Sequence, residues 1–208
     1  MKRLESVFPP LLFLSGLAAL GHGLATGTGV VRVALGLYLV WTLLELRITF
    51  RVHPGDAGGD DAASMPLYGL ARGAVVASAV FVPPLWAPSD AVFQGVALAV
   101  FVAGVVLRLG AIRQLGRFYS HKVRTLTDHM IVRSGPYRLV RHPAYSGMVV
   151  GHIGFVALLL NPVSLFALVG LLVPAIVHRI RVEERTLMEL TGYPDYARGR
   201  KRLVPAVW

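Results

Sequence analysis

A short polar segment at the start of an apolar run holds the residues of this chain that are best suited to chemistry. Residues 134–147 read SGPYRLVRHPAYSG, which places ring and guanidinium side chains between turn residues. His142 precedes Pro143, and proline lacks a backbone N–H and disfavours helix at the residue before it. The imidazole is therefore expected at the entrance of a helix, where we predict that it contacts a ligand.

A second polar cluster lies about forty residues further on, at residues 179–184 (RIRVEE). Arg179 and Glu183 are one helical turn apart, and an exposed ion pair at this spacing adds only about 0.5 kcal/mol to stability. A charged pair at a membrane boundary is instead a candidate functional site. Two apolar runs joined by Asn161-Pro162 precede it. If these runs form a helical hairpin, both clusters emerge on the same side of a membrane.

The composition indicates a membrane protein, because 55% of the residues are hydrophobic and only 15% are charged. We predict an all-α, polytopic protein with about six transmembrane helices, since most of the apolar runs approach the ~20 residues that cross a bilayer. The chain is expected to be a single membrane domain, 1–208, with N-terminal helices in 1–112 and a functional core in 113–208. The apolar runs are 8–25, 30–50, 67–86, 91–112, 144–160 and 162–180.

The basic residues predict an orientation. Apart from Arg32, Arg72 and Arg108, every Lys and Arg lies in 2–3, 47–51, 113–141 or 179–202, whereas the turns near 26–29, 87–90 and 161 have none. Positive residues favour the cytoplasmic side, so both termini are expected there, in the plasma membrane if the protein is prokaryotic. The net charge of +10 is then explained by membrane topology and by attraction to anionic lipid headgroups. No nucleic-acid partner is predicted.

Several polar residues outside the two clusters are given structural roles by this layout. Arg32, Arg72 and Arg108 are expected to snorkel to the interface from helix ends, and Glu45 and Arg47 to anchor there. Residues 193–196 are expected to end the last helix, and the basic tail 198–202 to lie against headgroups. The chain has no cysteine, which excludes disulfides and thiolate metal sites. The aspartates of 53–66 fit no calcium loop, so no metal is predicted.

The C-terminal half, over roughly 113–205, resembles a known family in the order and spacing of its residues. The first stretch comprises His129, Ile131, Val132, Gly135, Pro136, Tyr137, Val140, Arg141, His142, Pro143, Tyr145 and Gly147. Asn161 and Pro162 follow, and then Arg179, Glu183, Glu184, Leu187, Gly192 and Tyr196. Together they are similar to the isoprenylcysteine carboxyl methyltransferases and their prokaryotic relatives. The first three expected helices show no pattern of this family.

The resemblance implies a membrane-embedded methyltransferase that uses S-adenosylmethionine without a Rossmann domain. The glycine-rich loop that is typical of a Rossmann domain is absent from this sequence. It implies a cytosolic cofactor pocket closed by the C-terminal segment, and a lipophilic small-molecule, prenylated or lipid acceptor. By resemblance, Arg179 orients the acceptor carboxylate, and His121, Lys122 and Val123 are unassigned candidates for a further cofactor contact. The implied cofactor-binding residues are His129, Met130, Ile131, Val132, Tyr137, His142, Pro143, Ala144, Tyr145 and Glu183.

Other functions fit the same residues less closely. A phospholipid amine or a thiol acceptor would have to lose a proton, and only His121, His142 or a carboxylate could take it, which favours a carboxylate acceptor. Some membrane lipid or steroid reductases have a similar Arg-His-Pro-Asn-Tyr element, but this chain has Ala144 in place of the asparagine. A non-enzymatic membrane scaffold is the third alternative. The sequence does not identify the acceptor or the oligomeric state.

Overall fold

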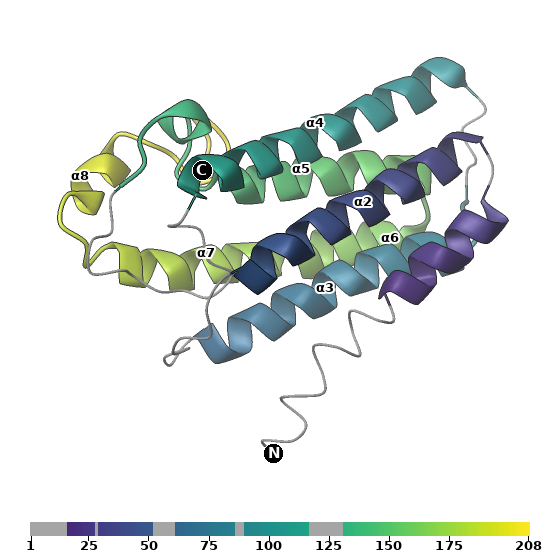
Figure 1. Ribbon diagram of the computed structural model, residues 1–208, viewed down its shortest axis with the longest axis horizontal. Coiled ribbons are helices and arrows are strands. Elements are labelled where there is room, and N and C mark those ends of the chain that lie inside the picture. Colours follow the sequence, from purple (N-terminus) through teal and green to yellow (C-terminus); the bar gives the residue numbers. More distant parts are fainter. Residues whose placement is uncertain (1–15, 28, 52–60, 86–89, 117–130) are drawn as a thin grey trace.

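The computed structural model describes residues 16–27, 29–51, 61–85, 90–116 and 131–208 (Figure 1). These residues form helices and turns without a strand, which confirms the all-α prediction for the described part of the chain. α6, η3 and α7 follow one another without a break, and η3 has π-helical geometry. The elements are 16–26, α2 (Gly29–Arg51), α3 (Asp61–Phe81), α4 (Ala91–Leu115), η2 (Gly135–Arg138), α5 (Pro143–Leu158), α6 (Pro162–Phe166), η3 (Ala167–Leu172), α7 (Val173–Leu187) and α8 (Tyr193–Arg198).

The long helices run side by side along the longest axis of the molecule (Figure 1). α4 packs along α5, and the continuous helix α6–η3–α7 packs along α3. Among the described residues, three helical segments have the length and composition to cross a membrane: 64–81, 91–115 and 162–187. α5 is apolar but has only 16 residues. The chain is thus a helical membrane protein, in which three of the six expected spans meet these criteria.

The contact between α4 and α5 is made by glycines whose backbones touch. A Cβ atom on Gly104 would lie 2.1 Å from the backbone nitrogen of Gly151, and one on Gly154 would lie 2.3 Å from that of Phe101. Small residues permit such close approach between membrane helices, where dispersion contacts replace the hydrophobic effect as the driving force. Near the same interface a Cβ on Gly147 would lie 2.6 Å from the backbone nitrogen of Arg108. This contact fixes the first turns of α5 against α4.

Asn161 connects α5 to α6 and confirms the predicted helical hairpin. Its Oδ1 accepts a hydrogen bond from the backbone N–H of Ser164 at 2.8 Å, which caps the start of α6. Its Nδ2 donates to the carbonyl of Ser78 at 3.1 Å, close to the end of α3. The start of α5 and the end of α7 therefore lie at the same end of the bundle (Figure 1).

Two predicted helix boundaries are wrong for identifiable reasons. α3 covers Asp61–Phe81 and not 67–86, because it ends before Pro83 and Pro84 and begins within the Gly/Asp-rich segment that was expected to be a loop. Tyr193–Arg198 does not end the preceding helix; it forms α8. α7 stops at Leu187, and Gly192 adopts a left-handed φ of 83° that starts the new helix.

The interfacial role expected for Arg72, Arg108 and Glu45 is also wrong. Arg108 is only 2% exposed, and both arginines pair with Glu45 inside the bundle. A charge at membrane depth is costly unless it is paired, so the three residues group around one carboxylate instead of reaching for the interface. Arg32 lies at the exposed end of α2 and donates to the carbonyl of Gly27 at 2.9 Å. Arg47 is exposed.

The glycine contact predicts a position-dependent effect of one added methyl group. Gly104→Ala should destabilise the protein by roughly 1–3 kcal/mol, because the new Cβ overlaps the backbone of α5. Gly110→Ala on the same helix faces open space and should be neutral or stabilise by up to ~1 kcal/mol, because alanine favours helix. Thermal unfolding of the detergent-solubilised variants measures both. Equal unfolding temperatures would contradict the close contact.

Candidate functional site

A buried carboxylate, Glu184, lies at the centre of the candidate site. Glu184 is 5% exposed, and its Oε1 accepts from Arg141 Nη1 at 2.7 Å and from His142 Nε2 at 3.2 Å. Its Oε2 accepts from Arg202 Nε at 2.6 Å. These donors come from the segment before α5 and from the C-terminal tail, so one side chain of α7 binds two other parts of the chain.

The local sequence explains why His142 lies at this position. His142 directly precedes Pro143, which occupies the first turn of α5, and the residue is buried. The prediction that it stands at a helix entrance is confirmed. Upstream, Gly135 takes a φ of 59° and begins the short helix η2, which buries Tyr137 against α4. The hydroxyl of Tyr137 donates to the carbonyl of Ala111 at 3.4 Å.

The C-terminal tail runs across the site and contacts the segment before α5. The backbone N–H of Arg141 donates to the carbonyl of Lys201 at 2.8 Å, and that of His142 donates to Arg202 at 3.0 Å. Ser146 Oγ donates to the carbonyl of Leu203 at 2.6 Å. Backbone groups that precede α5 would otherwise be unpaired, and the tail satisfies them. The tail therefore covers the start of α5.

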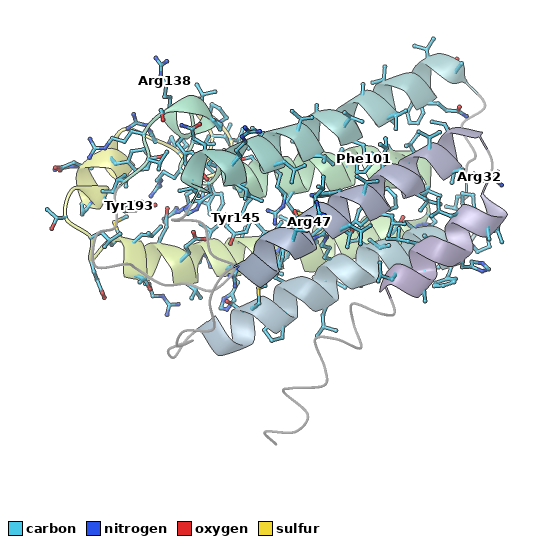
Figure 2. All side chains as sticks on the ribbon, in the orientation of Figure 1. Arg32, Arg47, Phe101, Arg138, Tyr145 and Tyr193 are labelled. Atoms are coloured by element: carbon cyan, nitrogen blue, oxygen red, sulfur yellow. The ribbon has the colours of Figure 1, made fainter. Side chains whose placement is uncertain are left out.

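α8 also contacts the segment that precedes α5. The hydroxyl of Tyr196 donates to the carbonyl of Tyr137 at 2.9 Å, and Arg200 stacks over the Tyr196 ring at 4.6 Å. Burial raises the pKa of Tyr196 to about 12 and also raises that of Tyr193. Both phenols therefore stay protonated at neutral pH and are able to donate a hydrogen bond. Tyr193 lies at this end of the bundle and Arg32 at the opposite end (Figure 2).

Arg179 lies deeper in the bundle, five residues before Glu184 on α7. It is 3% exposed; its Nε donates to the hydroxyl of Tyr145 at 2.9 Å, and its Nη1 donates to Ser64 Oγ at 3.0 Å. The ring of Tyr145 lies 6.0 Å from that of His142. The two polar clusters are therefore in contact, as the hairpin predicted, and α3 contributes through Ser64.

The other predicted residues occupy different surroundings. Ile131 and Val132 are half-buried and pack beside Tyr193 and Tyr137 respectively, and Pro143 and Ala144 are buried at the start of α5. Glu183 is half-buried, and the contact with His142 is made by its neighbour Glu184. The predicted residues His129 and Met130 and the candidates His121, Lys122 and Val123 lie outside the described residues.

Sequence reasoning did not place Ser64, Glu184 or Arg202 among the candidate site residues. The motif contains both glutamates, and the deciding signal is which of them faces the bundle. Glu184 follows the buried Ile180 by four residues, but Glu183 follows Arg179, which is 3% exposed, by the same spacing, so the spacing alone does not separate the two glutamates. Ser64 and Arg202 lie outside the motif, and no sequence pattern marked them as site residues.

The buried donors at the site include Arg141 Nε and the hydroxyl of Tyr193, which have no hydrogen-bond partner among the described residues. Buried polar atoms are almost always paired, so unpaired ones at a site indicate a missing ligand or water. Both can donate to an oxygen. Together with the carboxylates of Glu183 and Glu184, the site offers donors and acceptors to a polar ligand.

Comparison with known proteins identifies this region. Residues 97–189 match the family model described as "Isoprenylcysteine carboxyl methyltransferase (ICMT) family". The chain is 34% identical over 114 residues to protein-S-isoprenylcysteine O-methyltransferase B of Arabidopsis thaliana, which covers 53% of this chain and 58% of the relative. It is 40% identical over 90 residues to the Saccharomyces cerevisiae protein-S-isoprenylcysteine O-methyltransferase, covering 42% of this chain and 38% of the relative.

A third relative, the protein-S-isoprenylcysteine O-methyltransferase of Schizosaccharomyces pombe, is 38% identical over 116 residues, covering 54% of this chain and 48% of the relative. The chain thus spans about half the length of the curated relatives that it matches. The matched residues include His142, Arg179 and Glu184, the three side chains around which the site is built. Residues 97–189 are thus similar to the isoprenylcysteine carboxyl methyltransferase family.

Proposed function

We propose that this protein is an S-adenosylmethionine-dependent methyltransferase of the membrane that methylates the carboxylate of a lipophilic acceptor. One observation carries the proposal: Glu184, which binds His142, and Arg179, which binds Tyr145, project from one helix. Their partners lie close together, with 6.0 Å between the ring centroids of His142 and Tyr145. A polar site near the tail and a buried arginine deeper in the bundle are thus close enough to bind two reactants side by side.

The residues around Glu184 suit the cofactor. When bound, S-adenosylmethionine supplies a methyl group that is already activated on a sulfonium. Glu183 and Glu184 would accept hydrogen bonds from amino or ribose hydroxyl groups, and the unpaired donors of Arg141 and Tyr193 would meet its oxygens. The proposed cofactor-binding residues are His129, Met130, Ile131, Val132, Tyr137, His142, Pro143, Ala144, Tyr145 and Glu183.

Arg179 suits a carboxylate acceptor. A carboxylate needs no general base to accept a methyl group; it needs correct placement and partial desolvation. The planar guanidinium pairs with a carboxylate through two parallel N–H groups. Its contacts with Tyr145 and Ser64 fix the plane of the group. Arg179 would therefore orient the acceptor, whose apolar part would lie among the helices.

The acceptor atom is proposed to be oxygen. The relatives are O-methyltransferases by name, which supports this choice over nitrogen or sulfur and gives no support to the reductase alternative. An amine or thiol acceptor would also need a base, and the imidazole of His142 is already engaged with Glu184. The prenylated cysteine in the relatives' names makes a prenylated or other lipid acid the acceptor class to test first.

The proposed arrangement places both clusters and both termini on the cytoplasmic side, where a soluble cofactor is available. The positive-inside distribution of Lys and Arg supports this orientation. The start of α5, the end of α7 and the tail lie at one end of the bundle, and the connection between α5 and α6 lies at the other (Figure 1). An acceptor would arrive laterally from the bilayer while the cofactor arrives from the cytosol.

The first prediction separates cofactor binding from acceptor binding. His142→Ala should lose saturable binding of S-adenosylhomocysteine in isothermal titration, because the imidazole joins the start of α5 to Glu184. Arg179→Ala should keep that binding and lose methyl transfer, since the arginine acts only on the acceptor. Titrating Glu183→Gln and Glu184→Gln in parallel identifies which glutamate contacts the cofactor. If folded wild-type protein gives no binding, the methyltransferase proposal fails.

The second prediction concerns the geometry of Arg179. Arg179→Lys should lower kcat/KM by about 100-fold, because a point charge cannot hold a carboxylate in the orientation that a planar fork imposes. Arg181→Lys is the matched control: Arg181 lies two residues along the same helix and is exposed. Methyl transfer from labelled cofactor into lipid extract gives the rates. Normal turnover by Arg179→Ala would rule out the carboxylate-orienting role.

The third prediction concerns topology. The chain has no cysteine, so single cysteines can be introduced without a background. Cysteines at the exposed positions Ser134 and Gly199 should react with an impermeant maleimide only from the cytoplasmic side. A cysteine at Leu85, whose N–H donates to Leu160 at the other end of the bundle, should react only from outside. Labelling of Leu85→Cys and Ser134→Cys from the same side would refute the orientation.

A further inference from the structure

One face of α3 carries polar side chains into the apolar bundle. Ser64, Tyr68 and Arg72 follow each other at intervals of four residues, which places them on successive turns of one helix face, ~6 Å apart. We refer to these three residues as the α3 stripe. Ser64 accepts a hydrogen bond from Arg179 at one end, and Arg72 binds Glu45 at the other. The stripe lies outside the residues that match the family model.

Tyr68, in the middle of the stripe, has a buried hydroxyl with no role in the fold. The residue is 5% exposed and packs in the main apolar core. Its ring stands edge-on to that of Tyr145, with 6.5 Å between the centroids, and Tyr145 in turn binds Arg179. The Tyr68 hydroxyl has no hydrogen-bond partner in the part of the chain that the structure describes.

Arg72, one turn further along, is held rigidly and also keeps one donor without a partner. Its Nε donates to the hydroxyl of Tyr38 at 2.9 Å, and its Nη1 donates to Glu45 Oε2 at 2.6 Å. The guanidinium lies 4.7 Å from the centre of the Trp41 ring. Its Nη2 is buried and unpaired within the described residues. Arg72 follows Tyr68 by four residues and so lies one turn along the same helix face.

Two unpaired donors on neighbouring turns, one and two turns along α3 from the serine that binds Arg179, point to a ligand. A buried donor without a partner is costly to the protein, and the cost is recovered when a ligand supplies an acceptor. A hydrocarbon offers no acceptor to these two donors. A protonated amine would be repelled by the cationic donor. An oxygen with partial or full negative charge matches both.

We propose that Tyr68 and Arg72 form an oxygen-binding subsite for the lipophilic acceptor, next to Arg179. This inference rests on the proposed function and extends it, because it adds α3 to the acceptor site. Tyr68 OH and Arg72 Nη2 donate to a carbonyl or carboxylate oxygen of the acceptor. The protein then selects lipids that carry such an oxygen, and the α3 stripe distinguishes them from hydrocarbon chains of the surrounding bilayer.

Tyr68→Phe tests the subsite, because it removes only the unpaired hydroxyl. Binding of radiolabelled palmitate to the detergent-solubilised protein should weaken about tenfold or more, the size expected for a hydrogen bond to a charged oxygen. Without lipid, the unfolding temperature should stay the same or rise, since no hydrogen bond within the protein is lost. Ser78→Ala, also on α3, removes a hydroxyl that bonds only to Ala74 and Val75 of its own helix, and should leave palmitate binding unchanged.

Methyl palmitate, measured in parallel, identifies the oxygen. If Tyr68→Phe weakens palmitate and methyl palmitate alike, a neutral carbonyl oxygen fills the subsite; if it weakens palmitate alone, the carboxylate does. Both results support the subsite. It is overturned if Tyr68→Phe binds both lipids as the wild type does, if the wild type binds neither, or if Tyr68→Phe lowers the unfolding temperature.

S-adenosylhomocysteine titration keeps this test separate from the proposed function. Tyr68→Phe should bind the cofactor product as the wild type does, because the stripe lies on the acceptor side of Arg179. Lipid binding that depends on Tyr68 in a protein that never binds S-adenosylhomocysteine would support the subsite and refute methyl transfer. If the protein binds S-adenosylhomocysteine normally but its lipid binding does not depend on Tyr68, the subsite is refuted and the proposed methyl transfer is supported.

Discussion

The buried carboxylate of Glu184 is the interaction on which the site depends. A single buried charge would be unstable among apolar helices, and it is balanced here by Arg141, His142 and Arg202. Because these partners come from the start of α5 and from the tail, satisfying one charge also assembles the site. The backbone hydrogen bonds of 141–142 to 201–202 then hold the tail over the start of α5. Removing Glu184 would take away the counter-charge that Arg141 and Arg202 share.

The helices that precede the matched region contribute to the same end of the molecule. Glu45 on α2 and Arg72 on α3 form a buried cluster with Arg108, and Arg108 Nη1 donates to the carbonyl of Ala144 at 3.1 Å. This contact connects the N-terminal helices to the first turn of α5, two residues after His142. Ser64 makes a similar connection to Arg179. The N-terminal helices therefore do more than anchor the chain, because their polar side chains fix the geometry of the site.

Local structure around the site could be predicted from the sequence, but contacts between residues far apart in the sequence could not. Pro143 determines the start of α5 and Asn161 determines the hairpin, so the meeting of the two polar clusters could be predicted. Arg108 looked like a snorkelling residue because its partner Glu45 lies 63 residues away, and hydropathy does not reveal such a pair. The contact of the tail with 141–142 was not predicted, because charge patterns do not reveal the backbone groups that the tail satisfies. The choice between Glu183 and Glu184 required the helix face, which the motif alone does not give.

The central claim is that the methyl group ends on a carboxylate oxygen, and the lability of the product tests this directly. Purified protein, tritiated S-adenosylmethionine and a membrane lipid extract should give an apolar labelled product. Mild base should release its label as volatile methanol, because methyl esters hydrolyse whereas N-methyl and S-methyl groups do not. Arg179→Ala should give no volatile label. Label that stays in the lipid after base treatment, or that forms equally with Arg179→Ala, would contradict the account.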